Sequence, residues 1–202
     1  MQRRFVVIGQ TATASGDFSL DDLPGSSGRL DVLLRCVRAG LLISHDVRRD
    51  TVVYLVLNGG PRAPRSIKFD GRTSEYLRPD ERSLAGAIRN LLGRTPAVES
   101  FDESTRGVSI ARGGLDAVIA DLGAFVPYTL DVRGSDIRTA SIDSSAPVFF
   151  IGDHLGFDDA THARLVALRS VPLSLGPVSV QADDAIAIMA NELDRRSMAP
   201  LR

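Results

Sequence analysis

Several residue types are scarce in this chain of 202 residues, and each scarcity excludes a class of protein. Cys36 is the single cysteine, which excludes an internal disulfide and a zinc site made of several cysteines. It lies in an apolar segment, so we expect a small buried hydrophobe rather than a nucleophile. No stretch approaches the roughly 20 apolar residues that span a bilayer, and no basic start with an apolar run indicates a signal peptide. We therefore expect a cytoplasmic protein without a membrane partner.

Lysine is almost absent, because Lys68 is the only one and arginine supplies the rest of the 24 basic residues. The formal net charge is -1 at pH 7, so the chain lacks the overall basic field of proteins that coat DNA. We expect no DNA partner. A local arginine cluster can still bind phosphate, since the planar guanidinium group matches phosphate geometry.

Motifs of the common phosphate, metal and nucleophile sites are missing. There is no Walker loop, no G-x-G-x-x-G after a strand, no H-E-x-x-H and no G-x-S-x-G. The three histidines, His45, His154 and His162, are not spaced to bind a metal from one element, and we expect no metal. Ser44 and Asp46 flank His45, but adjacent residues point in different directions and cannot form a hydrolase triad by themselves.

Apolar patterning alternates between strand and helix along the whole chain. Strands are predicted at residues 4–8, 52–57, 66–69, 108–111, 125–130, 147–151 and 171–175. Helices are predicted at residues 30–41, 80–91, 115–122, 158–168 and 182–196, and residues 9–28 and 93–106 are predicted as loops. The alternation predicts one α/β domain over residues 1–202, with a mainly parallel sheet flanked by helices.

Three loops have the composition of ligand sites. Residues 25–29 open a helix, where main-chain N–H groups and the Arg29 guanidinium group can hold an anion. The alternative is a simple entry loop with Ser27 as the N-cap. Residues 152–156 and 173–178 each follow a strand, and ligands of open α/β sheets bind beyond the carboxyl ends of strands. Their main-chain groups can hold adenine and an amino-acid moiety, although residues 152–156 can equally be an ordinary strand-to-helix turn.

The segments DLPGSSGRLDVLLRC, SHDVRRD, PDER, PVFFIGDHLG and PLSLGP follow one another in an order that is typical of a known family. Through them, residues 4–194 resemble the archaeal tRNA pseudouridine N1-methyltransferases, which belong to the SPOUT class of RNA methyltransferases. The resemblance implies a SPOUT fold with a C-terminal trefoil knot, which is rare among proteins, and a homodimer. It implies an enzyme that methylates N1 of pseudouridine at position 54 in the T-loop of tRNA. S-adenosylmethionine would be the methyl donor.

The resemblance also implies site residues. Those expected to contact S-adenosylmethionine are Leu130, Gly152, Leu173, Ser174, Leu175, Gly176, Pro177, Val178 and Ala185. Those expected to contact RNA are Arg29, His45, Arg48 and Arg49. Asp31 is the first candidate for accepting the N1 proton and Asp50 the second, while Arg29 would stabilise the developing charge.

Other interpretations of the same residues stay open. Asp31, Arg48, Arg49 and Asp50 can instead form an ion-pair network that fixes the helix ends, and His45 can be a buried histidine that holds its loop. The substrate can also be pseudouridine in ribosomal RNA, or the protein can be an RNA-binding relative that has lost catalysis.

Overall fold

The computed structural model describes residues 2–75, 77–94 and 99–197 of the chain. The main strands are β1 (Arg3–Thr13), β4 (Thr51–Gly59), β5 (Arg65–Asp70), β6 (Asp102–Thr105), β7 (Val108–Arg112), β8 (Val126–Asp136), β9 (Pro147–Gly152) and β10 (Val171–Ser174). A small hairpin pairs β2 (Leu42–Ile43) with β3 (Asp46–Val47). The helices are α1 (Leu23–Ser26), α2 (Leu30–Leu41), α3 (Glu81–Gly93), α4 (Leu115–Leu122), α5 (Asp159–Ala167) and α6 (Ala182–Ser197).

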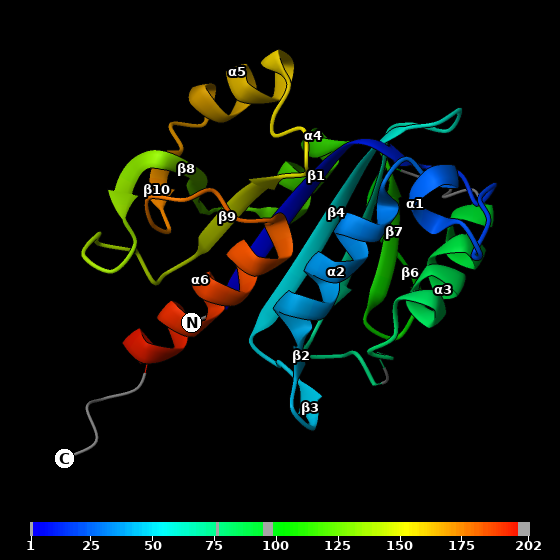
Figure 1. The fold of residues 1–202 in the computed structure, drawn as a ribbon, viewed down its shortest axis with the longest axis horizontal. Helices are drawn as coiled ribbons and strands as arrows, with labels where there is room; N and C mark the ends of the chain where they lie inside the picture. The colour runs from blue at the N-terminus through cyan, green and yellow to red at the C-terminus, as the bar shows by residue number, and fades with distance from the viewer. Residues whose placement is uncertain (1, 76, 95–98, 198–202) are drawn as a thin grey trace.

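The eight main strands form one sheet in the order β10-β8-β9-β1-β4-β5-β7-β6 (Figure 1). The five strands from β10 to β4 are parallel, and β5, β7 and β6 extend the sheet with antiparallel pairs. β1 and β4 are buried along most of their length, as continuous apolar runs in a parallel sheet predict. The predicted α/β fold with a mainly parallel sheet is confirmed.

Helices cover both faces of the sheet. Phe5 and Val7 of β1 point to the face covered by α2, α3 and α6, while Val6 and Ile8 point to the face covered by α4 and α5. α6, near the end of the chain, packs beside α2 on the same face of the sheet (Figure 1). Cys36 of α2 is fully buried in this layer, so its prediction as a small core residue is confirmed. In the described part of the chain, no helix is long and apolar enough to cross a bilayer.

Two segments predicted as loops contain regular structure. Within residues 9–28, β1 continues to Thr13 and the short helix α1 forms. Gly28 permits this arrangement, because its φ is +61° and a Cβ there would lie 1.9 Å from the carbonyl oxygen of Thr11. Within residues 93–106, β6 forms at the edge of the sheet. Its sequence, DEST, is polar as edge strands often are, so it has no apolar pattern to reveal it.

β8 is also longer than predicted, because it continues past Leu130 to Asp136. Its second half pairs with the end of β10, where Leu173 opposes Ser135 and Ser174 opposes Asp136. Gly134 allows this close approach, since a Cβ there would lie 2.5 Å from the carbonyl carbon of Pro172. The two strand ends are thereby held together next to the loop that leads into α6.

Candidate functional site

A pocket of about 290 Å³ lies where β8 and β10 end. We call it the strand-end pocket. Its walls come from residues 130–132, from Leu173, from the loop between β10 and α6, and from Ala185 in the first turn of α6. Most of the lining side chains are apolar, and Gly176 exposes main chain to the space. Such a wall suits a flat apolar group that is oriented by main-chain hydrogen bonds.

Six of the nine residues predicted to hold the cofactor line this pocket: Leu130, Leu173, Leu175, Gly176, Val178 and Ala185. Gly152, Ser174 and Pro177 are not among the lining residues. Ser174 shapes the loop instead, because its hydroxyl accepts a hydrogen bond from the Gly176 N–H at 3.2 Å. Gly152 ends β9, opposite Ile8 of β1. Asp131, Val132, Ser179 and Val180 also line the pocket and were not predicted, although each lies within two residues of Leu130 or Val178.

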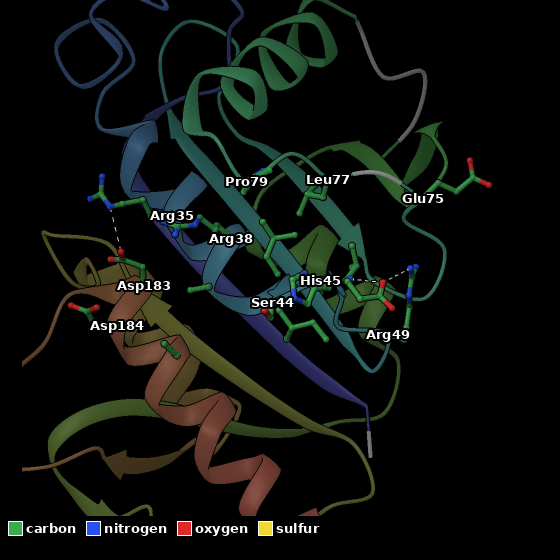
Figure 2. A pocket seen from close by; sticks show the side chains of 16 residues that line it. Arg35, Arg38, Ser44, His45, Arg49, Glu75, Leu77, Pro79, Asp183 and Asp184 are labelled. Atoms are coloured by element: carbon green, nitrogen blue, oxygen red, sulfur yellow. Dashed lines mark hydrogen bonds and ion pairs between the residues drawn. The ribbon is translucent and has the colours of Figure 1, made fainter.

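A larger hollow of about 760 Å³, which we call the charged groove, lies between α2, the β2–β3 hairpin, the segment before α3 and the start of α6. Figure 2 shows Arg35 and Arg38 on α2 facing this space, with Asp183 and Asp184 on the α6 side. Asp183 and Asp184 immediately precede Ala185, so the first turn of α6 contributes to both the groove and the strand-end pocket.

Two of the four predicted RNA-binding residues, His45 and Arg49, line the charged groove. His45 is exposed, so the alternative of a buried histidine is wrong: the hairpin turn lifts it out of the core. Arg49 donates to the carbonyl oxygen of Ser74 at 2.7 Å and pairs with Asp46 at 2.8 Å. Arg38, which the sequence argument missed, makes no hydrogen bond or ion pair through its guanidinium group with any described residue.

Arg48 does not line the groove and belongs instead to an ion-pair network with Arg3 at the start of β1 and Asp194 of α6. It pairs with Asp194 of α6 at 2.8 Å, and Arg3 pairs with Asp194 at 2.7 Å and with Asp50 at 3.1 Å. Burial would raise the pKa of Asp194, but hydrogen bonds from the two arginines outweigh burial and hold that pKa below its ordinary value. The predicted ion-pair network is confirmed for Arg48 and Asp50, with Arg3 as a member that the sequence argument missed.

Asp31 is the centre of a second ion-pair cluster, in the first turn of α2. Its side chain is only 3% exposed, and Arg29 and Arg35 each contact it at 3.0 Å. Burial would raise the pKa of Asp31, but hydrogen bonds from both guanidinium groups hold it below its ordinary value. Arg29 has a left-handed backbone with φ of 67° and stands at the N-cap position predicted for Ser27. The Ser27 hydroxyl still accepts a hydrogen bond from the Leu30 N–H at 3.1 Å.

The two carboxylates proposed for proton transfer lie far apart in one chain. Asp31 is at the start of α2, and Asp50 precedes β4 beside the first residue of β1, beyond the end of the same helix. Twelve helical residues at about 1.5 Å each separate the two ends by about 18 Å. A single chain therefore does not bring Asp31 and Asp50 to one point. Among the described residues, no group of three or more His, Cys, Asp or Glu side chains is placed to hold a metal ion.

Comparisons with known proteins identify a family that matches nearly the whole chain. Residues 2–198 match the family model described as "Putative SAM-dependent RNA methyltransferase". A tRNA (pseudouridine(54)-N(1))-methyltransferase of Methanosarcina acetivorans is 40% identical over 193 residues, which are 96% of this chain and 91% of the relative. The enzyme of the same name from Methanocaldococcus jannaschii is 34% identical over 207 residues, covering 98% of this chain and all of the relative.

The fold is shared with a solved structure. The crystal structure of Archaeoglobus fulgidus Nep1 bound to S-adenosylhomocysteine superposes with a TM-score of 0.64, covering 96% of this chain and 98% of that chain. The two sequences are 16% identical, so this likeness concerns the fold alone. The family is assigned from the family model, which matches nearly the whole sequence. The chain belongs to the family of S-adenosylmethionine-dependent RNA methyltransferases.

Proposed function

We propose that this protein transfers a methyl group from S-adenosylmethionine to N1 of pseudouridine at position 54 of tRNA, the reaction named for its relatives. The observation that carries the proposal is the strand-end pocket. Six of the nine residues that the family resemblance assigned to the methyl donor line one apolar pocket, although they come from three separate segments of the chain. A protein that acts on tRNA is expected in the cytoplasm, and one sheet that spans residues 3–174 supports a single domain.

The residues of the strand-end pocket fit the methyl donor. Leu130, Leu173 and Leu175 supply apolar surface for adenine, and main-chain groups around Gly176 can hydrogen-bond to its edge. When bound there, S-adenosylmethionine supplies an electrophilic methyl group. The loop after β10 is held in place by two hydrogen bonds between the Ser174 hydroxyl and the Gly176 main chain. The pairing of β10 with β8 holds the start of the same loop. A rigid pocket holds the donor in one orientation, and such positioning is a large part of catalysis by group transfer.

The charged groove is the proposed RNA site. Arg38 and His45 are exposed, and the Arg38 guanidinium group is free to bind a phosphate. Arg49 has one face occupied by Asp46 and main-chain carbonyls, so it contributes charge more than new hydrogen bonds. Residues at the start of α6 line both the groove and the strand-end pocket. The proposal is that a flipped nucleobase reaches the donor at this helix end.

Asp31 is proposed to act through the arginines that surround it. Three guanidinium hydrogen bonds already reach its two oxygens, and its lowered pKa makes it a weak proton acceptor. It fixes Arg29, whose side chain is 42% exposed and can face RNA phosphate or a developing negative charge on the base. Replacement of Asp31 by Asn is expected to lower the rate at saturating RNA while cofactor affinity changes little. An unchanged rate in single-turnover measurements would remove Asp31 from the chemistry.

We further propose a homodimer and a knotted C-terminus. Val178, Val180 and Ile188 are 71%, 43% and 41% exposed and lie in the loop before α6 and on α6 itself. Exposed apolar side chains on a loop and the helix that follows it are a feature of protein interfaces, which supports the proposed dimer. The chain passes from β10, which pairs with β8, to α6, which packs against α2. This path supports the proposal of a threaded C-terminal segment. Sedimentation that shows only monomers at micromolar concentration would contradict the dimer.

Transfer of a labelled methyl group tests the proposed function directly. The pure protein is incubated with labelled S-adenosylmethionine and with two tRNA transcripts that differ only in pseudouridine or uridine at position 54. We expect label only on the pseudouridine transcript. Label on neither tRNA but on pseudouridine-containing ribosomal RNA would move the substrate to the ribosome. Binding of RNA without any transfer, or without affinity for the methyl donor, would indicate a non-catalytic relative.

A further inference from the structure

The strand-end pocket is lined by one charged residue that neither the family resemblance nor the pattern of turns assigns. Among the described residues that line it, Asp131 is the only ionisable one, and Ser179 is the only other polar side chain. The Asp131 side chain is 32% exposed. In a mostly apolar pocket, a few polar groups fix the orientation of the ligand, and the Asp131 carboxylate is the one charged candidate among the described lining residues.

The Asp131 carboxylate is already neutralised by a neighbouring arginine. The main-chain N–H of Arg133 donates to Oδ1 at 2.8 Å, and the Arg133 guanidinium group donates to Oδ1 at 3.1 Å and to Oδ2 at 2.9 Å. The hydrogen bonds from the Arg133 side chain and main chain keep the pKa of Asp131 below its ordinary value, so the group stays ionised at neutral pH. A carboxylate in this ion pair has little excess charge with which to bind a cation.

One acceptor position of the carboxylate remains. An ionised carboxylate has about four lone-pair positions, and Arg133 occupies three of them, two on Oδ1 and one on Oδ2. Because the arginine already balances the charge of the carboxylate, a neutral hydroxyl group is the donor best matched to the one remaining acceptor position. Acidic side chains recognise ribose hydroxyls in this way in other nucleotide sites.

We infer that Asp131 accepts a hydrogen bond from one ribose hydroxyl of the methyl donor, through Oδ2, and so selects a ribonucleoside in the strand-end pocket. Arg133 is a positioning residue that holds the carboxylate in place. The inference rests on the proposed use of this pocket for S-adenosylmethionine. In this role Asp131 neither opposes the sulfonium charge nor binds the amino-acid end of the methyl donor.

The chain offers a matched control for this inference. Asp136 and Arg138 repeat the same arrangement five residues later, with the Arg138 main chain and guanidinium group donating to the Asp136 carboxylate at 2.9, 3.2 and 2.8 Å. Asp136 does not line the strand-end pocket. Replacement of Asp136 by Asn therefore removes an equivalent ion pair without removing the proposed hydroxyl contact.

Calorimetric titration of the full-length protein tests the inference with S-adenosylmethionine, S-adenosylhomocysteine and 5′-methylthioadenosine, which share the ribose. We expect Asp131→Asn to weaken all three by about tenfold, the effect of one hydrogen bond to a charged group, and Asp136→Asn to leave all three unchanged. Loss confined to S-adenosylmethionine would show that Asp131 senses the sulfonium charge. Loss that spares 5′-methylthioadenosine would place Asp131 at the amino-acid end. Either result, or no loss, overturns the inference.

The wild-type protein supplies a second test that does not depend on the folding of a variant. Of the 2′-deoxy and 3′-deoxy forms of S-adenosylhomocysteine, one is expected to bind about tenfold more weakly than the parent compound. Equal affinity for all three compounds overturns the inference while leaving the cofactor pocket intact. If the wild-type protein binds none of them, the proposed function fails together with the inference.

Discussion

The strand-end pocket and the charged groove are both lined by residues at the start of α6, yet they are built in different ways. The pocket depends on main chain: its walls are the ends of strands and a loop fixed by Ser174, with apolar side chains around them. The groove depends on charged side chains from four separate segments. The shape of a main-chain site follows from the topology of the sheet. The binding capacity of a charged site depends on which of its charged side chains have no partner within the protein.

The groove shows why the count of arginines is a poor guide to binding. Arg48 and Arg49 stand side by side in the sequence, but Arg48 pairs with Asp194 while Arg49 faces the groove and pairs with Asp46. Arg38 has no such partner among the described residues and is exposed in the same groove. A guanidinium group without an internal partner offers all five of its N–H donors to RNA phosphate, whereas a paired one such as Arg49 has some of its donors already engaged.

The largest expected effect comes from filling the strand-end pocket. Ala185 is 5% exposed and lines the pocket, so Ala185→Leu overpacks it. Overpacking costs about 1–3 kcal/mol. If the bound ligand bears that cost, affinity for S-adenosylhomocysteine measured by calorimetry falls by about fivefold to about 160-fold. Ala187→Leu is the control, because Ala187 is exposed on the groove side of the same helix. Unchanged affinity in Ala185→Leu would show that the cofactor binds elsewhere.

The next effect concerns stability at the start of α2. Asp31→Asn removes a buried carboxylate bound by two arginines and is expected to lower the free energy of unfolding by about 2 kcal/mol at pH 7. The pKa of Asp31 is lowered in the folded protein, so its stabilisation is full above the unfolded pKa of about 3.9 and is lost as pH falls through the folded value.

Urea denaturation at pH 7 and at pH 3 measures this effect. The difference between the wild-type protein and Asp31→Asn should shrink at the lower pH. The control is Asp21→Asn, because Asp21 forms an exposed pair with Arg82 and should contribute little at either pH. A difference that is the same at both pH values would show that the charge of Asp31 does not stabilise the fold.

A smaller effect is expected from the unpaired arginine of the groove. Arg38→Ala should weaken tRNA binding by about threefold to tenfold, because one phosphate contact is lost, and reduce the salt dependence of binding by about 0.7–0.9 in logarithmic slope. Filter binding over a range of salt concentrations measures both. Arg82→Ala serves as control, since Arg82 is exposed but outside both sites. Equal slopes for wild type and Arg38→Ala would exclude Arg38 from the RNA site.

The smallest effect is expected from the loop that frames the pocket. Ser174→Ala removes the hydroxyl that contacts both the N–H and the carbonyl oxygen of Gly176. One neutral hydrogen bond contributes about 1 kcal/mol, so affinity for S-adenosylhomocysteine should fall about fivefold if the loop must be ordered before binding. An unchanged affinity would indicate that the pairing of β10 with β8 is enough to hold the loop.

The sequence predicted what depends on apolar periodicity and on turns. The helix at residues 30–41 and the buried strands were found because their patterns are strong, and the turn after Leu173 was found because Gly-Pro ends a strand. β6 was missed because an edge strand of polar residues has no such pattern. The second half of β8 was missed because its pairing partner, β10, lies about 40 residues further along the chain, beyond any local signal.

The candidate site divides in the same way. The resemblance named six of the residues that line the strand-end pocket, since they belong to local segments of the chain. Pairing of charges, by contrast, depends on tertiary neighbours. No sequence spacing shows that Arg3 and Arg48 share Asp194, or that Arg29 and Arg35 surround Asp31. For this reason the arginine with no internal partner, Arg38, was overlooked, while the engaged Arg48 was assigned to RNA.

The most direct test of the central claim is mass spectrometry of nucleosides from tRNA that carries pseudouridine at position 54. The tRNA is incubated with the pure protein and S-adenosylmethionine and then digested. The account predicts N1-methylpseudouridine, formed by the wild-type protein and strongly reduced with Ala185→Leu. A methyl group found on a ribose oxygen, on another nucleoside or on no product at all, although the protein binds S-adenosylmethionine, would contradict it.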